Sequence, residues 1–157
     1  MNNLLIDDMA RDPRSRSIGR IITAISRYSR MYLTSELKDY DLMVIPLYLI
    51  HSLSGGDWIK QEDLIVKHGV DKAVMTRSLG KLVEDGCIEK MPDPKDRRAS
   101  LVRLTDNGVV LRRQTKEILN TFNEKVLEGF NEMELKQLYG YLDRLLINSI
   151  RALEEDR

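Results

Sequence analysis

The stretch VDKAVMTRSLGKLVEDGCIEKMPDPKDRRASLVRLTDNG, residues 70–108, decides the fold. Asp71 is a good N-cap and Gly86 follows the last apolar position, so a helix is predicted over 71–84. Two short apolar strands, 87–91 and 101–104, then flank a proline-containing loop, which is typical of a β-hairpin. Thr105 is suited to cap a long helix over 106–128. The order is therefore helix, hairpin, helix.

The helix predicted over 71–84 has two different faces. One face carries the core candidates at helical spacing, Met75, Ser78, Leu79 and Leu82. The opposite face carries Ala73, Thr76, Arg77 and Gly80, with Lys72 and Lys81 beside it. Small residues let a helix enter the DNA major groove, where Arg and Thr can contact bases or phosphates. A merely solvated helix face would also be small and polar, so this pattern alone leaves both interpretations open.

The hairpin loop gathers three cations, Lys95, Arg97 and Arg98. Two prolines, Pro92 and Pro94, stiffen this loop because they fix φ. Asp96 precedes Arg98 by two residues, and we expect its carboxylate to pair with that guanidinium and aim it. Such an arginine can enter a narrow minor groove, whose potential is negative. In the second strand Arg103 is expected to face outward, between two core residues. The alternative is a solvated turn.

The segments around this stretch extend the pattern. A short helix over 61–68, closed by Gly69, makes a helix-turn-helix with 71–84. Helices over 18–35 and 42–54 precede it, and Asn131 and Glu134 resemble a capping box that opens a last helix to about 154. A helix-turn-helix followed by a hairpin is a winged helix. The fold class is therefore mainly α with a small β-wing, flanked by long helices.

The flanking helices carry apolar stripes, over 18–32 and 135–153, that a small winged helix cannot cover. A closed two-fold dimer would bury both stripes. It would also place two recognition helices about 34 Å apart, which is one turn of DNA, on a pseudo-palindromic site.

The formal net charge is zero, which excludes a uniformly basic nucleic-acid coat. Residues 11–38 nevertheless hold seven basic side chains and two acids, whereas 106–157 hold eight and ten. Polyanion binding must therefore come from a local patch. The basic arm with Arg11, Arg14 and Arg16 either reaches DNA or is disordered.

Catalysis, metal binding and a membrane span find no support in the sequence. It contains no nucleophile–base pair, no glycine-rich phosphate loop and no cluster of metal ligands, so no enzyme, cofactor or metal is expected. Its single cysteine, Cys87, is expected to be buried and unreactive. No apolar run approaches the roughly 18 residues of a transmembrane helix. The absence of a signal peptide and of paired cysteines predicts a cytoplasmic protein.

These residues resemble the heart of the MarR family of transcription regulators. The specific motifs are the wing D-P-x-D-x-R at 93–98 and the L-T-x-x-G that opens the long helix at 104–108. The match runs without gaps from Leu42 to Gly108, and the flanking helices agree in number and length. The resemblance implies that 1–157 is one homodimeric domain. Its winged helix spans 42–105, and 18–41 and 106–157 supply the dimerisation helices.

The resemblance also assigns roles. The wing arginine of the family falls on Arg98 and its orienting aspartate on Asp96. Gln61, at the start of the preceding helix, could hold a phosphate through its backbone N–H. The predicted contacts to double-stranded DNA are Gln61, Lys72, Ala73, Thr76, Arg77, Lys81, Lys95, Asp96, Arg97, Arg98 and Arg103. This chain departs from the family at Lys60, where Thr or Ser usually caps a helix, and at Ile65 and His68, where the family usually has Ala and Leu.

Many members of the family release DNA when a small aromatic anion binds. The residues that could line such a pocket here are Tyr28, Met31, Tyr32, Tyr48 and His51, although core or interface packing is the more ordinary explanation for each of them. The sequence therefore predicts a dimeric, sequence-specific repressor that a small molecule relieves. The alternative is a winged-helix adaptor for other proteins, which would be favoured if the arginines of wing and helix were neutralised by their own acids.

Overall fold

The computed structural model describes residues 17–53 and 56–155. The chain forms two compact units, of which the first ends at Leu119 and the second begins at Asn120. The N-terminal basic arm and Gly55, at which the second helix was expected to end, lie outside the described residues. The predicted division into a winged helix over 42–105 and dimerisation helices describes functions and not compact units, and it stays a prediction.

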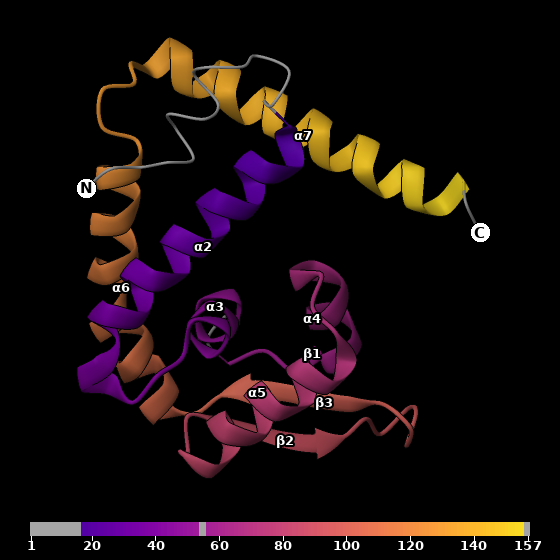
Figure 1. Ribbon diagram of the computed structural model, residues 1–157. Helices are drawn as coiled ribbons and strands as arrows, with labels where there is room; N and C mark the ends of the chain where they lie inside the picture. The colour runs from indigo at the N-terminus through magenta and orange to yellow at the C-terminus, as the bar shows by residue number, and fades with distance from the viewer. Residues whose placement is uncertain (1–16, 54–55, 156–157) are drawn as a thin grey trace. The chain divides into compact units, whose positions relative to one another are not determined.

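The first unit is built mainly from helices (Figure 1). They are α2 (Ile18–Glu36), the 3₁₀ helix η2 (Lys38–Tyr40), α3 (Val44–Ser52), α4 (Gln61–His68) and α5 (Lys72–Glu84), followed by the start of α6 (Asp106–Val126). Helix α3 is shorter than the 42–54 expected from the sequence. Pro46 lies in its first turn, where a missing N–H costs least, and is buried with Leu47, Leu49 and Ile50. This confirms α3 as a central buried helix.

The helix-turn-helix is confirmed. Gly69 ends α4 in the left-handed region at φ 57°, a conformation that glycine adopts without steric cost. Asp71 caps α5 by accepting a hydrogen bond from the backbone N–H of Ala73 at 2.7 Å. The start of α4 is different, because Lys60 provides no capping hydrogen bond. The departure from the family at Lys60 therefore leaves the N–H groups of that turn without a capping side chain at this position.

The wing belongs to a three-stranded antiparallel sheet in the order β1-β3-β2. The sequence predicted β2 (Ile88–Pro92) and β3 (Ser100–Leu104) but missed β1 (Ile59–Lys60), which pairs with β3. In the register, Lys90 faces Val102 and Glu89 faces Arg103. Because paired residues share a face of a sheet, buried Val102 puts Lys90 on the face that meets the core, and Arg103 lies on the opposite face.

The junction between wing and long helix explains the L-T-x-x-G motif. The hydroxyl of Thr105 donates to the Gly86 carbonyl at 2.6 Å and accepts from the Gly108 N–H at 3.1 Å, which confirms Thr105 as the helix cap. A Cβ at Gly108 would lie 1.9 Å from the carbonyl oxygen of Cys87. Only glycine fits there, and the start of α6 can therefore touch the start of β2.

Helix α6 is also tied to α3. The guanidinium of Arg112 donates to the Leu53 carbonyl at 2.6 Å, where α3 ends. One turn further on, the buried hydroxyl of Thr115 lies 2.9 Å from Nε2 of His51. Neither contact follows from sequence spacing, because the partners are far apart along the chain.

The second unit consists of the end of α6 and the long helix α7 (Glu132–Glu155). The predicted capping box is confirmed: the Asn131 N–H donates to the Glu134 carboxylate at 2.8 Å, and the Glu134 N–H donates to the Asn131 side chain at 3.0 Å. Helix α7 buries no residue, and its stripe leaves Leu142, Leu146 and Leu153 exposed. No helix within the described residues is long and apolar enough to span a membrane.

Candidate nucleic-acid interface

The two predicted faces of α5 are confirmed. Its buried residues are Met75, Ser78, Leu79 and Leu82. Its exposed residues include Lys72, Ala73, Thr76, Arg77 and Gly80. A Cβ built on Gly80 would have no atom within 4 Å, so there is open space beside the exposed face at this position. A polar surface with small residues is what a helix needs to approach base edges closely.

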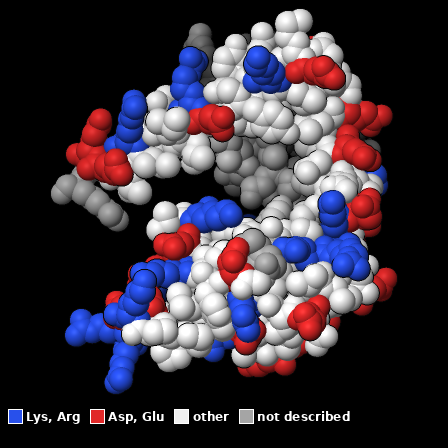
Figure 2. Space-filling view, turned by 180° about the vertical axis from the view of Figure 1, so that it is seen from behind, with Lys and Arg blue, Asp and Glu red and all other residues white. Residues whose placement is uncertain are grey.

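The wing presents a concentrated positive charge. Lys95, Arg97 and Arg98 are all exposed at the turn between β2 and β3. Figure 2 shows Lys and Arg side chains gathered on this hairpin, at the lower left of that view. Within residues 17–53 and 56–155 none of the three forms an ion pair with a carboxylate. Their charge is therefore available to a polyanion.

The turn itself is held by two aspartates. Asp96 accepts a hydrogen bond from the backbone N–H of Arg98 at 3.0 Å, and Asp93 accepts one from the N–H of Lys95 at 2.8 Å. The expected pairing of Asp96 with the Arg98 guanidinium is thus corrected. A short aspartate side chain reaches the backbone two residues ahead more readily than it reaches the end of a long side chain. Asp96 orients Arg98 by shaping the loop.

The sequence did not reveal the structural role of Asp93 in the wing. This residue is only 4% exposed, and its backbone N–H donates to the Ala99 carbonyl at 3.0 Å across the base of the loop. Its carboxylate also lies 3.7 Å from the Lys60 ammonium on the missed strand β1. Asp93 therefore closes the loop and joins it to the edge of the sheet.

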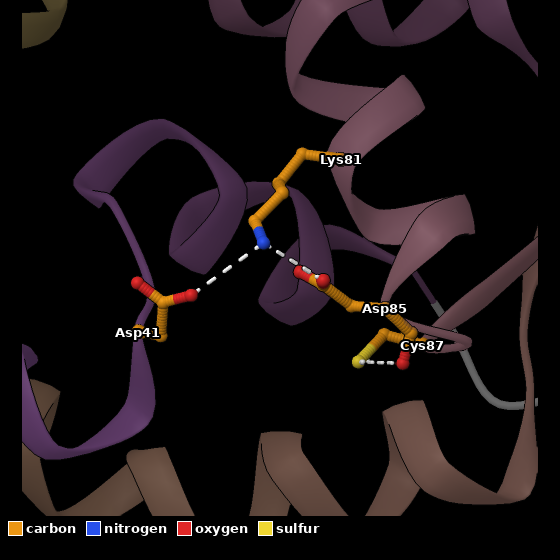
Figure 3. A network of polar contacts seen from close by, with 4 residues as sticks. All are labelled: Asp41, Lys81, Asp85 and Cys87. Carbon is orange, nitrogen blue, oxygen red and sulfur yellow. Dashed lines mark hydrogen bonds and ion pairs between the residues drawn. The ribbon is translucent and has the colours of Figure 1, made fainter.

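Lys81 is already paired with two acids (Figure 3). Its ammonium lies 2.9 Å from the Asp85 carboxylate and 3.5 Å from that of Asp41. The hydrogen bond that Lys81 donates to the Asp85 carboxylate, more than any other contact, raises the pKa of Lys81. Asp41 lies in the turn before α3, so Lys81 connects α5 with that turn.

Arg103 is also engaged within the protein. It pairs with Glu89 across the strands, and its guanidinium lies 4.6 Å from the ring centroid of Trp58. As predicted, Arg103 faces away from the core, but Glu89 and Trp58 hold it. The register predicts the pairing with Glu89 only once the strand ends are known, and Trp58 carried no signal because β1 was missed.

A third set of side chains connects β2, α4 and α5 of the winged helix. The Lys90 ammonium on β2 donates to Oε1 of Gln61 at 2.7 Å, and Nε2 of Gln61 lies 3.5 Å from the Thr76 hydroxyl on α5. Gln61 is the first residue of α4. Two of the predicted contact residues, Gln61 and Thr76, are therefore brought together, and Lys90 is added to them.

The residues expected to bind an effector lie on α2 and α3. Tyr28, Met31 and Tyr48 are exposed, whereas Tyr32 and His51 are half-buried. Tyr28 lines one hollow on α2 and Met31 lines another, so these two hollows do not bring the residues together. Burial, with Arg112 and Lys116 nearby, lowers the pKa of His51. Two cationic side chains, Arg112 and Lys116, therefore lie near His51.

Cys87 is buried, as expected. Burial is the largest of the effects that raise the pKa of its thiol, so little thiolate forms near neutral pH. The part of the chain that the structure describes holds no group of three or more His, Cys, Asp or Glu side chains that could bind a metal ion.

Residues 47–108 match a family described as a winged helix DNA-binding domain. The HTH-type transcriptional regulator BilQ of Clostridioides difficile (strain CD3) is 31% identical over 142 residues, which cover 89% of this chain and 94% of that protein. The solved structure of a MarR transcriptional regulator from Methanosarcina mazei Go1 is 26% identical, with a TM-score of 0.76 and coverage of 86% and 97%. The chain belongs to the MarR family. It is therefore a transcription regulator with a winged-helix DNA-binding region, and not an enzyme.

Another MarR-family structure, that of a mutant MarR from E. coli, was solved with operator DNA. It is 25% identical to this chain, with a TM-score of 0.73, and the match covers 82% of this chain and 93% of that one. The resemblance inferred from the wing and from the L-T-x-x-G motif is thereby confirmed.

Proposed function

We propose that this MarR-family chain binds a pseudo-palindromic DNA operator as a homodimer, with α5 in the major groove and the wing in the adjacent minor groove. The observation that carries the proposal is a set of unpaired cations on the surface of α5 and the wing. None of them forms an ion pair with a carboxylate among the described residues; they are Lys72, Arg77, Lys95, Arg97 and Arg98. Five such charges on the exposed surface of a neutral chain are most simply explained by a polyanion.

The cations of this surface fall into two groups. Lys81 and Arg103 are matched by carboxylates of the chain, at Asp85, Asp41 and Glu89. A matched cation releases few counterions from DNA, because its charge is already compensated. We therefore assign the salt-dependent part of the affinity to the unpaired group. Lys81 and Arg103 position the helix and the sheet.

The adaptor hypothesis required arginines that are neutralised by the chain's own acids. Only Arg103 meets that condition among the proposed contacts, whereas Arg77, Arg97 and Arg98 do not. The side chains of Asp93 and Asp96 accept hydrogen bonds from the backbone of the loop, so the charges of the wing cations are not compensated by them. This distribution favours DNA over a protein partner.

The dimer is supported by apolar surface that the chain leaves exposed. On α2 the exposed apolar residues include Ile18, Ile22, Ile25 and Met31, and on α7 they include Leu142, Leu146, Ile147, Ile150 and Leu153. Monomeric proteins rarely expose contiguous apolar patches of this kind, so these helices are the proposed interface. A two-fold axis would present the two α5 helices to successive turns of DNA, about 34 Å apart.

Repression relieved by a small aromatic anion is the finer part of the proposal, and it would act on DNA in the cytoplasm. It is supported by the exposed rings of Tyr28 and Tyr48 and by the positive surroundings of His51. The rings would offer stacking surface to an aromatic carboxylate, and the cations near His51 would offer compensating charge.

The wing provides a direct test. An operator is first selected from random duplex DNA with the full chain, and affinities are then measured by fluorescence anisotropy. Arg98→Ala should weaken binding by about 1–3 kcal/mol without changing thermal stability. Arg103→Ala on β3 is the matched control, because this guanidinium is already paired with Glu89, and it should weaken binding less. Normal binding by Arg98→Ala would contradict the assignment of the wing.

A further inference from the structure

Lys90, Gln61 and Thr76 form a short relay from the wing to the recognition helix. Lys90 lies on β2, Gln61 begins α4 and Thr76 lies on the exposed face of α5. The Lys90–Gln61 contact is short, at 2.7 Å, and the Gln61–Thr76 contact is 3.5 Å. Lys90 reaches the helices because it pairs with the buried Val102 in the sheet, whereas its neighbour Glu89 lies on the opposite face.

Elementary hydrogen-bond chemistry sets the direction of this relay. An ammonium can only donate, so the oxygen of the Gln61 amide must face Lys90. The NH₂ group, which can only donate, must then face Thr76. The oxygen of Thr76 therefore receives a hydrogen bond from Gln61, and the hydroxyl hydrogen points elsewhere.

The Thr76 hydroxyl differs from four other hydroxyls in the helices. Ser29, Ser52, Thr115 and Ser149 all donate to the carbonyl oxygen four residues earlier. Among the contacts of the described residues, Thr76 donates to no carbonyl of α5 and takes part only as the partner of Gln61. Its hydrogen is thus available to a group outside the protein.

We propose that Thr76 is a specificity-determining residue that acts as a hydrogen-bond donor toward DNA, and that Lys90 is a positioning residue that sets this polarity through Gln61. A donor selects base edges that accept in the major groove, namely N7 of a purine, O6 of guanine or O4 of thymine, over the amino groups of cytosine and adenine. This inference rests on the proposed binding of an operator by α5. Lys90 contributes without touching the DNA.

The test measures base preference instead of affinity alone. The operator selected with the wild-type chain is changed one base pair at a time, and the affinity for each variant is measured at several salt concentrations. Thr76→Val removes the hydroxyl at constant shape and should reduce discrimination at one base pair by about two- to tenfold, the range for one neutral hydrogen bond. Lys90→Met should lose discrimination at the same base pair, with an unchanged salt dependence.

Further variants separate positioning from other roles. Lys90→Arg keeps a donor toward Gln61 and should retain the wild-type preference. Gln61→Glu replaces the NH₂ group by an acceptor, so the Thr76 hydroxyl turns inward and discrimination falls at the same base pair. When Thr76 is already Val, Lys90→Met should have no further effect on discrimination. Thermal unfolding of each variant checks that the fold is kept.

Three results would overturn the inference. One is an equal loss of affinity on every sequence after Lys90→Met, with a salt slope reduced by about 1, because that is the signature of a phosphate contact. Another is unchanged discrimination after Lys90→Met or Thr76→Val. The third is a loss after Lys90→Met that persists when Thr76 is Val. Failure of the wild-type chain to prefer any duplex would instead contradict the proposed function itself.

Discussion

The winged helix and helix α7 use apolar residues in opposite ways. In the winged helix, Leu47, Leu79 and Leu82 are fully buried among their neighbours. Helix α7 is richer in leucine, yet Leu146 is 60% exposed and no residue of the helix is buried. The first region is therefore stabilised by its own core, whereas the second presents an apolar stripe that the dimer is proposed to cover. The comparison teaches that similar amphipathic patterns can serve a fold or an interface.

The largest expected effect separates the stripe of α7 from its polar side. Leu142→Asp would place an unpaired charge in the proposed interface, which costs about 3–5 kcal/mol when no partner is available. Sedimentation equilibrium should then show monomers or insoluble chain. Gln137→Asp is the control, because Gln137 lies on a different side of the same helix. A well-folded dimer that carries Leu142→Asp would contradict the interface.

A second pair of variants compares the two regions with one chemical change. Leu79→Ala should lower the free energy of unfolding by about 2–5 kcal/mol, because it leaves a cavity in the core. Leu146→Ala, at an exposed position, should act mainly on the dimer, and its effect on unfolding should depend on protein concentration. Urea denaturation at two protein concentrations measures both. Equal effects that do not depend on concentration would show that α7 belongs to a core within one chain.

A third pair tests the junction of wing and long helix. Gly108→Ala forces the start of α6 away from Cys87 and should cost about 1–3 kcal/mol of stability. Gly80→Ala is the opposite case, because nothing lies within 4 Å of the added Cβ, and alanine should stabilise α5 by about 1 kcal/mol. Thermal unfolding measures whether each substitution lowers or raises the stability of the protein. Tolerance of Gly108→Ala would mean that the close approach does not hold wing and helix together.

The smallest effect concerns pH. Burial lowers the pKa of both His51 and His68 in the folded protein, so the unfolded chain binds protons more readily between the two values. The contribution of these histidines to the free energy of unfolding is therefore complete above the ordinary histidine pKa of about 6.5. It is lost as the pH falls below that value. Urea denaturation from pH 7.5 to 5.5 should show this loss, and His51→Gln should reduce it. Stability that increases as the pH falls over this range would contradict the sign.

The sequence predicted most of the winged helix because strong local signals mark its limits. Asp71, Gly69, Thr105 and the Asn131–Glu134 box all cap helices as expected, since capping depends on residues a few positions apart. Strand β1 was missed because two residues carry no periodicity, and Trp58 was missed with it.

Contacts between distant elements could not be predicted. Arg112 with Leu53 and Lys90 with Gln61 depend on how helices and strands pack, which spacing along the chain does not reveal. At the site, the sequence identified the cations but not which of them form ion pairs within the protein. That Lys81 and Arg103 are paired, and that Asp96 binds the backbone of Arg98 and not its guanidinium, is visible only in three dimensions.

The central claim is that unpaired cations of the wing and of α5 bind the DNA backbone, and the salt dependence of operator affinity tests it most directly. Each phosphate contact changes the slope of log affinity against log salt by about −0.9. If about half of the unpaired cations in a dimer meet phosphates, the slope should be steeper than about −4. Replacing Arg98 by Ala should make it less steep, whereas replacing Arg103 should leave it nearly unchanged. A flat dependence of wild-type affinity on salt would contradict the account.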